Sequence, residues 1–168
     1  MTSPASPPAP RSFDRVAPWV AWVFRVALGV VFIAASVHKL VHPADFARSI
    51  ANYRILPDEL VNLAAIGLPW IEALSGAALV LGLSVRANLL VVEGLLALFI
   101  GALGWALARR LDVGCGCFSA GTEAQAMSRG TLLWDVVWFA MGLFALRYDR
   151  GYLSLALVRR RRLREPSA

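Results

Sequence analysis

Long apolar runs, separated by short polar segments, dominate the pattern of this chain. Four such runs are present: residues 18–37, 60–83, 87–108 and 131–146. A helix of about 20 apolar residues crosses the hydrocarbon core of a bilayer, and each run approaches that length, the last being the shortest. In the first run Ala34-Ala35-Ser36 resembles a signal-peptide cleavage site, but the run is long for a signal peptide and contains Arg25. The pattern therefore predicts an all-α integral membrane four-helix bundle.

The polar segments between the runs complete the predicted organisation. Residues 1–17 are rich in Pro, Ser and Ala, and we expect them to be disordered. The first outer loop, about residues 38–59, alternates polar and apolar positions, and we expect a short interfacial helix in it at about residues 43–53. The connection at residues 84–86 is tight, so the second and third spans should form an antiparallel hairpin. We place one four-transmembrane domain over residues 18–147 and a basic juxtamembrane tail over residues 148–168.

Composition and charge agree with a membrane protein and indicate its orientation. The chain is 58% hydrophobic and 17% charged, whereas about a quarter of the residues in soluble domains are charged. Four spans place both termini and the 84–86 turn on one side, with ten Arg residues against six Arg and Lys residues on the other. The positive-inside rule then predicts cytoplasmic termini. The basic run at residues 159–162 fits attraction to anionic lipid better than binding to nucleic acid, and we expect no nucleic-acid partner.

The only two cysteines stand one residue apart, in Gly-Cys-Gly-Cys-Phe, in the second outer loop. A disulfide holds its Cα atoms roughly 4.4–6.8 Å apart, whereas an extended pair with this spacing reaches about 7 Å, so Gly116 would have to bend the chain. Closing so small a loop stabilises a fold by only about 1.5 kcal/mol. We therefore interpret Cys115 and Cys117 as a redox pair that opens and closes on the oxidising, outer side of the membrane.

Two other interpretations of the cysteine pair remain open. One is a passive disulfide, and the other is a soft-metal site, since two thiolates can hold Cu(I). His38 and His42 lie in a different loop, which argues against a complete zinc site, and we predict no such metal centre. For redox chemistry, Lys39, Arg109 and Arg110 are the cations that could favour the thiolate.

Charged residues inside the apolar runs should face the interior of the bundle. Arg25 and Glu93 each lie about seven residues from the cytoplasmic end of their spans, at roughly the same depth. We predict a structural ion pair between them, with a proton path as the alternative. Helical spacing also predicts two inward faces. They comprise Arg25, Gly29, Phe32, Ser36 and Lys39 on the first span, and Glu93, Ala97, Gly101 and Gly104 on the third.

Glu72 lies near the middle of the second run, three residues after Pro69. A proline can kink a helix and leave backbone carbonyls for other partners. The sequence offers no obvious cation at the depth of Glu72. A structural role and a functional one, as a proton relay or a hydrogen-bonding group for a quinone, both fit this position.

Further candidate residues gather at the outer ends of the runs. Lys39 ends the first run on that side, and Asp135 lies one turn into the fourth. The same half contains Trp70, Trp105, Trp134 and Trp138. An interfacial aromatic belt explains such tryptophans, and a quinone pocket is the alternative. We predict that Lys39, Asp135 and Glu72 support the redox pair, with Lys39 favouring the thiolate and Asp135 carrying a proton.

Several of these elements together resemble the MauE/DoxX superfamily. They are Arg25-x-x-Leu28-Gly29, His38-Lys39-Leu40 with Pro43 and Phe46, Tyr53-x-x-Leu56-Pro57, Leu68-Pro69-Trp70-x-Glu72-x-x-x-Gly76 and Cys115-Gly116-Cys117-Phe118. They cover about residues 25–140, and the Cys-Gly-Cys-Phe element is similar to the MauE branch in particular. Ser119 stands where the family usually has glycine, and the polar position of the fourth span is Trp134-Asp135.

The resemblance implies a four-helix integral membrane protein. With the orientation predicted from charge, we expect a multi-pass protein of the bacterial inner membrane with its cysteine loop on the periplasmic side. The resemblance also implies thiol–disulfide chemistry that matures periplasmic methylamine dehydrogenase or another exported client, directly or with a thioredoxin-like partner. The alternative is a DoxX-like accessory or scaffold subunit of a quinone-linked complex. A quinone is the cofactor that both interpretations leave open.

Overall fold

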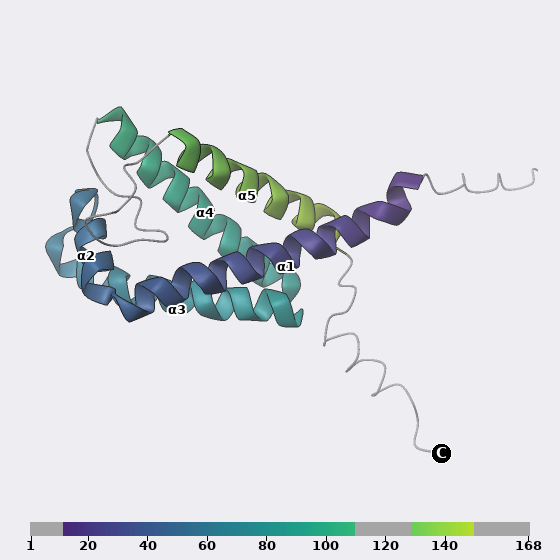
Figure 1. The fold of residues 1–168 in the computed structure, drawn as a ribbon, viewed down its shortest axis with the longest axis horizontal. Helices are drawn as coiled ribbons and strands as arrows, with labels where there is room; N and C mark the ends of the chain where they lie inside the picture. The colour runs from purple at the N-terminus through teal and green to yellow at the C-terminus, as the bar shows by residue number, and fades with distance from the viewer. Residues whose placement is uncertain (1–11, 110–128, 150–168) are drawn as a thin grey trace, which may run out of the picture.

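The computed structural model describes residues 12–109 and 129–149, and within these residues every element is an α-helix (Figure 1). The helices are α1 (Ser12–Val41), α2 (Pro43–Asn52), α3 (Asp58–Leu81), α4 (Val85–Ala108) and α5 (Arg129–Tyr148). Three of them, α1 over Val16–Val41, α3 and α4, are long and apolar enough to cross a membrane. The predicted all-α membrane class is confirmed for this part of the chain, whereas a fourth span along α5 stays a prediction.

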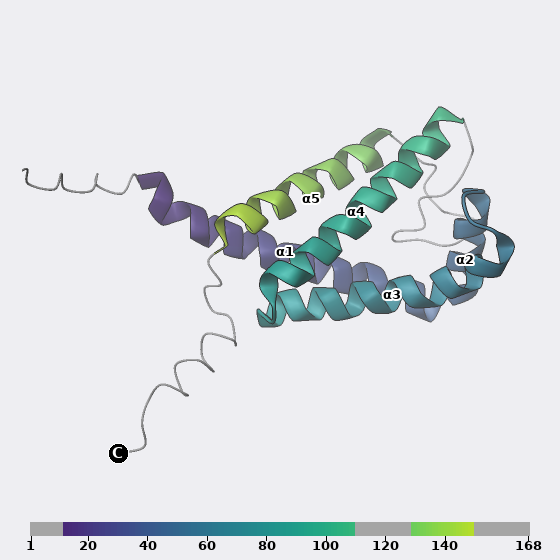
Figure 2. The same ribbon diagram turned by 180° about the vertical axis from the view of Figure 1, so that it is seen from behind.

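The long helices pack in a defined order. Helices α1 and α4 each pack against α3 and against α5, and the short α2 packs against α3 and α1 (Figures 1 and 2). Their common core includes Leu28 and Phe32 of α1, Leu79 of α3, Leu89 of α4 and Ala145 of α5. At the end near α2, Tyr53 packs with Leu103, Ala106 and Leu132. The end of α4 and the start of α5 therefore lie beside α2.

Local sequence explains where the helices begin and end. His42 precedes Pro43 and leaves the helical region, with φ −122° and ψ 61°, because a following proline disfavours that region. After Leu81, Gly82 takes a left-handed conformation with φ 69°. The Gly82 and Leu83 amides donate to the carbonyls of Leu79 and Ala78, as in a Schellman motif. The predicted 43–53 helix and the tight hairpin between the second and third runs are both confirmed.

Two glycines bring α1 and α3 into close contact. A Cβ atom on Gly29 would lie 2.8 Å from the carbonyl oxygen of Gly76, and a Cβ on Gly76 would lie 2.8 Å from that of Gly29. In a bilayer, where lipid tails remove most of the hydrophobic drive, small residues stabilise helix pairs by letting the backbones approach. This crossing sets the relative position of the polar residues on α1 and α3.

The inward face predicted for α1 is confirmed, since Arg25, Phe32, Ser36 and Lys39 are buried. The face predicted for α4 is wrong except at Glu93. Ala97 and Gly101 are exposed, and a Cβ on Gly101 or Gly104 would meet no other atom within 4 Å. Helix α4 instead buries a face that is mostly made of larger residues, namely Leu89, Val92, Leu96 and Leu103, together with Ala106. It contacts α3 and α5 through leucine side chains, so a small-residue stripe is no guide to its interface.

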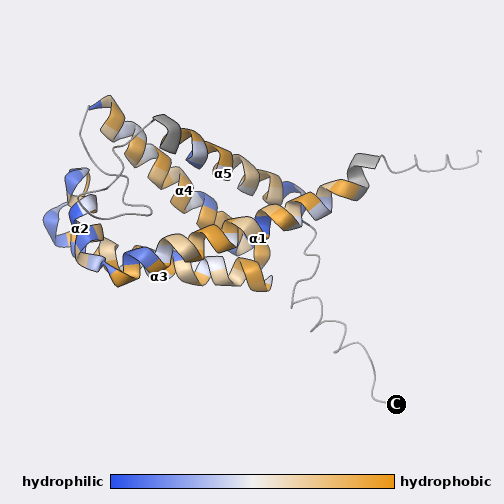
Figure 3. Cartoon of the chain, viewed as in Figure 1, coloured by the Kyte–Doolittle hydropathy of each residue, from blue (hydrophilic) through white to orange (hydrophobic). Residues whose placement is uncertain are grey.

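Helix α1 begins earlier than the apolar run. Residues 12–17, which we expected to be disordered, belong to this helix, and its first turns project beyond the other helices (Figure 1). Apolar residues dominate the long helices, whereas hydrophilic residues gather at α2 and the adjoining helix ends (Figure 3). Large exposed side chains such as Leu63, Leu90 and Leu98 fit a surface covered by lipid.

Candidate functional site

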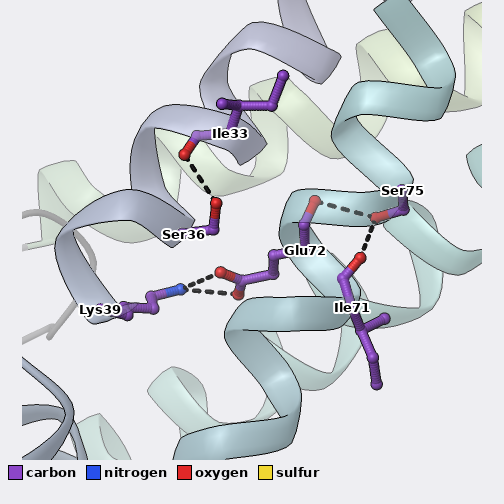
Figure 4. Close-up of polar contacts among 6 residues, drawn as sticks. All are labelled: Ile33, Ser36, Lys39, Ile71, Glu72 and Ser75. Atoms are coloured by element: carbon purple, nitrogen blue, oxygen red, sulfur yellow. Dashed lines mark hydrogen bonds and ion pairs between the residues drawn. The ribbon is translucent and has the colours of Figure 1, made fainter. Parts of the chain in front are cut away.

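Lys39 and Glu72 form a buried ion pair between α1 and α3 (Figure 4). The Lys39 Nζ atom lies 2.7 Å from each Glu72 carboxylate oxygen. Their side chains are 6% and 14% exposed. Glu72 therefore has a cation partner, contrary to the expectation from its depth. Side chains lean toward the N-terminus of their own helix. Because α1 and α3 run in opposite directions, the two side chains lean toward each other.

The surroundings of the pair hold Lys39 in place. The Phe46 ring of α2 lies 5.1 Å from Lys39 Nζ, within the range of a cation–π contact. Ser36 and Ser75 donate their hydroxyls to backbone carbonyls of their own helices, as Figure 4 shows. Among the described residues, the Glu72 carboxylate therefore receives its hydrogen bonds from Lys39 alone. The α1–α3 contact and α2 together fix the position of the ammonium group.

The ion pair lines a cavity of about 110 Å³ to which all five helices contribute. Helices α3 and α4 diverge from their tight turn (Figure 2), and both contribute to the lining, α3 with Leu68 and Glu72 and α4 with Leu95, Leu96, Leu98 and Phe99. Its charged lining consists of Lys39, Glu72 and Asp135. Its apolar walls include Phe32, Phe46, Leu95, Leu96, Phe99 and Trp138. The cavity combines a small polar cluster with aromatic and aliphatic walls, as ligand sites commonly do.

Asp135 contributes an unpartnered acceptor to this cavity. Its Oδ2 atom is buried and accepts no hydrogen bond from the residues that the structure describes. A buried polar atom without a partner is costly, so such atoms in native proteins call for a specific explanation. The three residues predicted from sequence to support the redox pair, Lys39, Glu72 and Asp135, are thus brought together in one place.

The predicted ion pair between Arg25 and Glu93 is wrong. Arg25 Nη1 instead lies 3.0 Å from Asp149 Oδ2, and both side chains are almost completely buried. The physical reason is the start of α1. This helix already includes residues 12–17, and its first turns project beyond the other helices (Figure 1). A depth counted from the start of the apolar run therefore placed Arg25 at the wrong level, and Arg25 meets Asp149, which follows α5. Asp149 directly follows α5 and stands three residues after the end of the last apolar run, and this carboxylate was the signal that sequence reasoning missed.

Glu93 occupies a separate position against α5. Both of its carboxylate oxygens are buried, with no hydrogen-bond partner among the described residues. A Cβ atom on Gly142 would overlap Glu93 Oε1, so the glycine makes room for the carboxylate. Gly142 was not among the residues singled out from sequence, because a single glycine in an apolar run has no distinctive pattern.

The remaining candidates are placed as follows. Trp70, Trp105 and Trp134 are 55%, 47% and 64% exposed, so they face outward, whereas Trp138 lines the cavity. The guanidinium of Arg109 lies 4.5 Å from the centre of the Trp105 ring. Within residues 12–109 and 129–149, no three His, Cys, Asp or Glu side chains could hold a metal ion together. Cys115, Cys117 and Arg110 lie outside the described residues.

The fold and this site define a helical membrane protein with a charge-lined cavity between its helices. A family model described as methylamine utilisation protein MauE matches residues 17–148, which include all of α2 to α5 and all but the first residues of α1. The chain belongs to the MauE family. The expected family resemblance is thereby confirmed.

Individual relatives agree with this membership. The methylamine utilization protein MauE of Paracoccus denitrificans is 33% identical over 129 residues, which cover 76% of this chain and 69% of the relative. The protein of the same name from Methylorubrum extorquens is 32% identical over 137 residues, which cover 81% of this chain and 70% of the relative. No solved structure matches the chain significantly.

Proposed function

We propose that this protein is a thiol–disulfide redox protein of the bacterial inner membrane. In this proposal Cys115 and Cys117 exchange a disulfide with an exported client protein. The observation that carries it is the meeting of Lys39, Glu72 and Asp135 in one cavity. Asp135, which lines this cavity, lies six residues after the start of α5 at Arg129, the helix that follows the cysteine-bearing segment.

The proposed topology is a four-helix bundle whose fourth span is α5, with cytoplasmic termini and a periplasmic cysteine loop. The uneven distribution of Arg and Lys supports this orientation. So does the compartment, because disulfides persist on the outer side of the inner membrane and are rare in the cytosol.

The proposed chemistry is thiol–disulfide exchange through a mixed disulfide. A thiolate of one cysteine attacks the client disulfide, or the reverse, and a cation nearby raises the thiolate population. In our proposal Lys39 supplies that positive charge, Glu72 holds Lys39 in position, and Asp135 accepts or returns the thiol proton. We propose methylamine dehydrogenase or another exported protein as the client, and the names of the relatives, which refer to methylamine utilisation, support the first of these.

Thiol trapping in native membranes tests the proposal. Membranes are equilibrated in glutathione or dithiothreitol buffers of defined potential, and free thiols are then labelled with a mass-adding maleimide. We expect both cysteines to change reversibly between labelled and protected at potentials above about −300 mV. The matched controls are Cys115→Ser, Cys117→Ser and the double variant. A pair that stays protected throughout this range is a structural bridge, and the redox proposal would then be wrong.

A further inference from the structure

The cavity beside Lys39 has hydrogen-bonding capacity that the described residues leave unused. Two of the three N–H groups of the Lys39 ammonium can point at the two Glu72 oxygens, which leaves one donor. Asp135 Oδ2 is a buried acceptor with no partner among these residues. A ligand that offers both an acceptor oxygen and, after protonation, a donor would satisfy both groups.

The cavity reaches the outer surface of the helices. Leu98 of α4 lines it and is also 63% exposed. In a membrane this part of α4 contacts the lipid tails, because α4 is one of the helices long and apolar enough to span the bilayer. A ligand that enters here must therefore dissolve in lipid.

The walls define the kind of ligand further. A plain acyl chain would leave the third N–H group of Lys39 and the Oδ2 atom of Asp135 without partners, which is costly in a buried site. The rings of Phe32, Phe46 and Trp138 favour a flat group. The volume of about 110 Å³ is smaller than the roughly 150 Å³ of an engineered cavity that holds benzene, but this cavity is partly open, so ring substituents can extend beyond its walls. A single substituted ring with carbonyl oxygens fits these limits.

We propose that this cavity binds the ring of a lipid-soluble quinone, with Lys39 donating a hydrogen bond to one carbonyl oxygen and Asp135 serving the proton transfer. The inference rests on the proposed thiol–disulfide function and names its electron acceptor. Two thiols lose two electrons and two protons and form one S–S bond. The quinone gains the same two electrons and two protons and becomes a quinol. The ring oxygens are thus acceptors before the reaction and donors after it.

A binding experiment tests the site independently of the cysteines. The full chain carrying Cys115→Ser and Cys117→Ser is placed in lipid nanodiscs and titrated with decylubiquinone, and quenching of tryptophan fluorescence is followed. We expect saturable quenching. Ala35→Phe fills the cavity and should weaken binding about ten-fold or more, whereas Ala34→Phe, on the neighbouring exposed position, should bind like the parent. Equal affinities of the two variants would overturn the site.

A second pair of variants tests the polar contact. Lys39→Met should weaken binding about ten-fold, as expected for loss of a hydrogen bond to a charged group. Arg48→Met removes an equal charge from α2, where Arg48 is 77% exposed, and should leave affinity unchanged. Decylbenzene, which lacks carbonyl oxygens, should compete weakly. Competition as strong as that of the quinone would show that lipid chains occupy the cavity and would overturn the proposal.

Turnover separates this inference from the function on which it rests. With dithiothreitol as the reductant, wild-type protein should convert quinone to quinol, and the double serine variant should bind quinone without accelerating its reduction. Equal rates of quinone reduction in the two proteins would contradict the thiol–disulfide function but would not contradict the quinone-binding site. Cysteines that exchange disulfides in a protein with no Ala35-dependent binding would contradict the quinone site alone.

Discussion

At the residue scale, Lys39 and Arg25, the buried charges of α1, are each paired with a carboxylate from a distant part of the chain. Lys39 meets Glu72 of α3, and Arg25 meets Asp149 after α5. Taking such charges out of water costs several kcal/mol per ion, which the partner must offset. Removal of one partner is therefore more harmful than removal of both.

Glu72→Gln should lower the free energy of unfolding by about 3 kcal/mol, because it leaves the Lys39 ammonium without its anion. Lys39→Met combined with Glu72→Gln should lose less than the two single losses added together. Denaturant unfolding in mixed micelles measures all of these values. As a control, Asp45→Asn breaks the largely exposed pair with Arg48 and should change stability by no more than about 0.5 kcal/mol. Additive losses at positions 39 and 72 would show that the pair is not coupled.

Gly142→Ala should destabilise the protein by about 1–3 kcal/mol, because the new methyl group would occupy the position of the Glu93 carboxylate. Addition of Glu93→Ala should restore most of the loss by vacating that space. Gly101→Ala is the matched control, since its methyl group would meet nothing within 4 Å. Thermal unfolding followed by circular dichroism compares the four proteins. A Gly142→Ala variant as stable as Gly101→Ala would contradict this packing.

At the element scale, the crossing of α1 and α3 positions the candidate site. Gly29 and Gly76 allow the backbones to touch, and the Lys39–Glu72 pair bridges the same two helices farther along. Helix α2 then covers the pair with Phe46. A change at the crossing should therefore affect the cavity without touching a charged residue.

Gly76→Ala should destabilise the α1–α3 contact by about 1–3 kcal/mol, because the added Cβ would lie 2.8 Å from a backbone oxygen that cannot rotate away. Gly67→Ala in the same helix is the control, as nothing lies within 4 Å of its Cβ. Guanidinium unfolding in detergent measures both. The crossing would be misplaced if Gly67→Ala proved the more harmful of the two.

At the scale of the whole molecule, the proposed topology places the turn between α3 and α4 in the cytoplasm and the cysteines outside. In a background without native cysteines, Ser84→Cys should react with a membrane-impermeant maleimide only after the inner membrane is opened. A single native Cys115 should react in intact spheroplasts under reducing conditions. The opposite labelling pattern would reverse the orientation and remove the cysteines from the oxidising compartment.

Much of the fold could be predicted from the sequence. Long apolar runs predicted α1, α3 and α4. The alternation of polar and apolar residues in the first outer loop predicted α2, and the short link before Arg86 predicted the hairpin of α3 and α4. Glu93 and the buried face of α1 were also predictable, because charges and small residues recur there at helical spacing. These features depend on local periodicity and length, which the chain displays directly.

The partners of the charged residues could not be predicted in the same way. We estimated the depth of each charged residue in the membrane by counting from the end of its apolar run. This estimate predicted a pair between Arg25 and Glu93 and predicted no cation near Glu72. Helix α1 starts before the apolar run, so the depth counted for Arg25 was wrong, and Arg25 lies level with Asp149. The backbones of Lys39 and Glu72 lie at different depths, but their side chains lean toward each other across antiparallel helices and therefore meet.

The sequence by itself determined which parts of the chain form the apolar helices described, the tight connection before Arg86, and the presence of unavoidable charges within apolar segments. Only the tertiary structure decided that Lys39, Glu72 and Asp135 share one cavity and that Arg25 binds Asp149. The reason is physical. Helix formation follows from neighbours along the chain, whereas pairing across helices depends on crossing points and side-chain reach, which close packing at Gly29 and Gly76 sets.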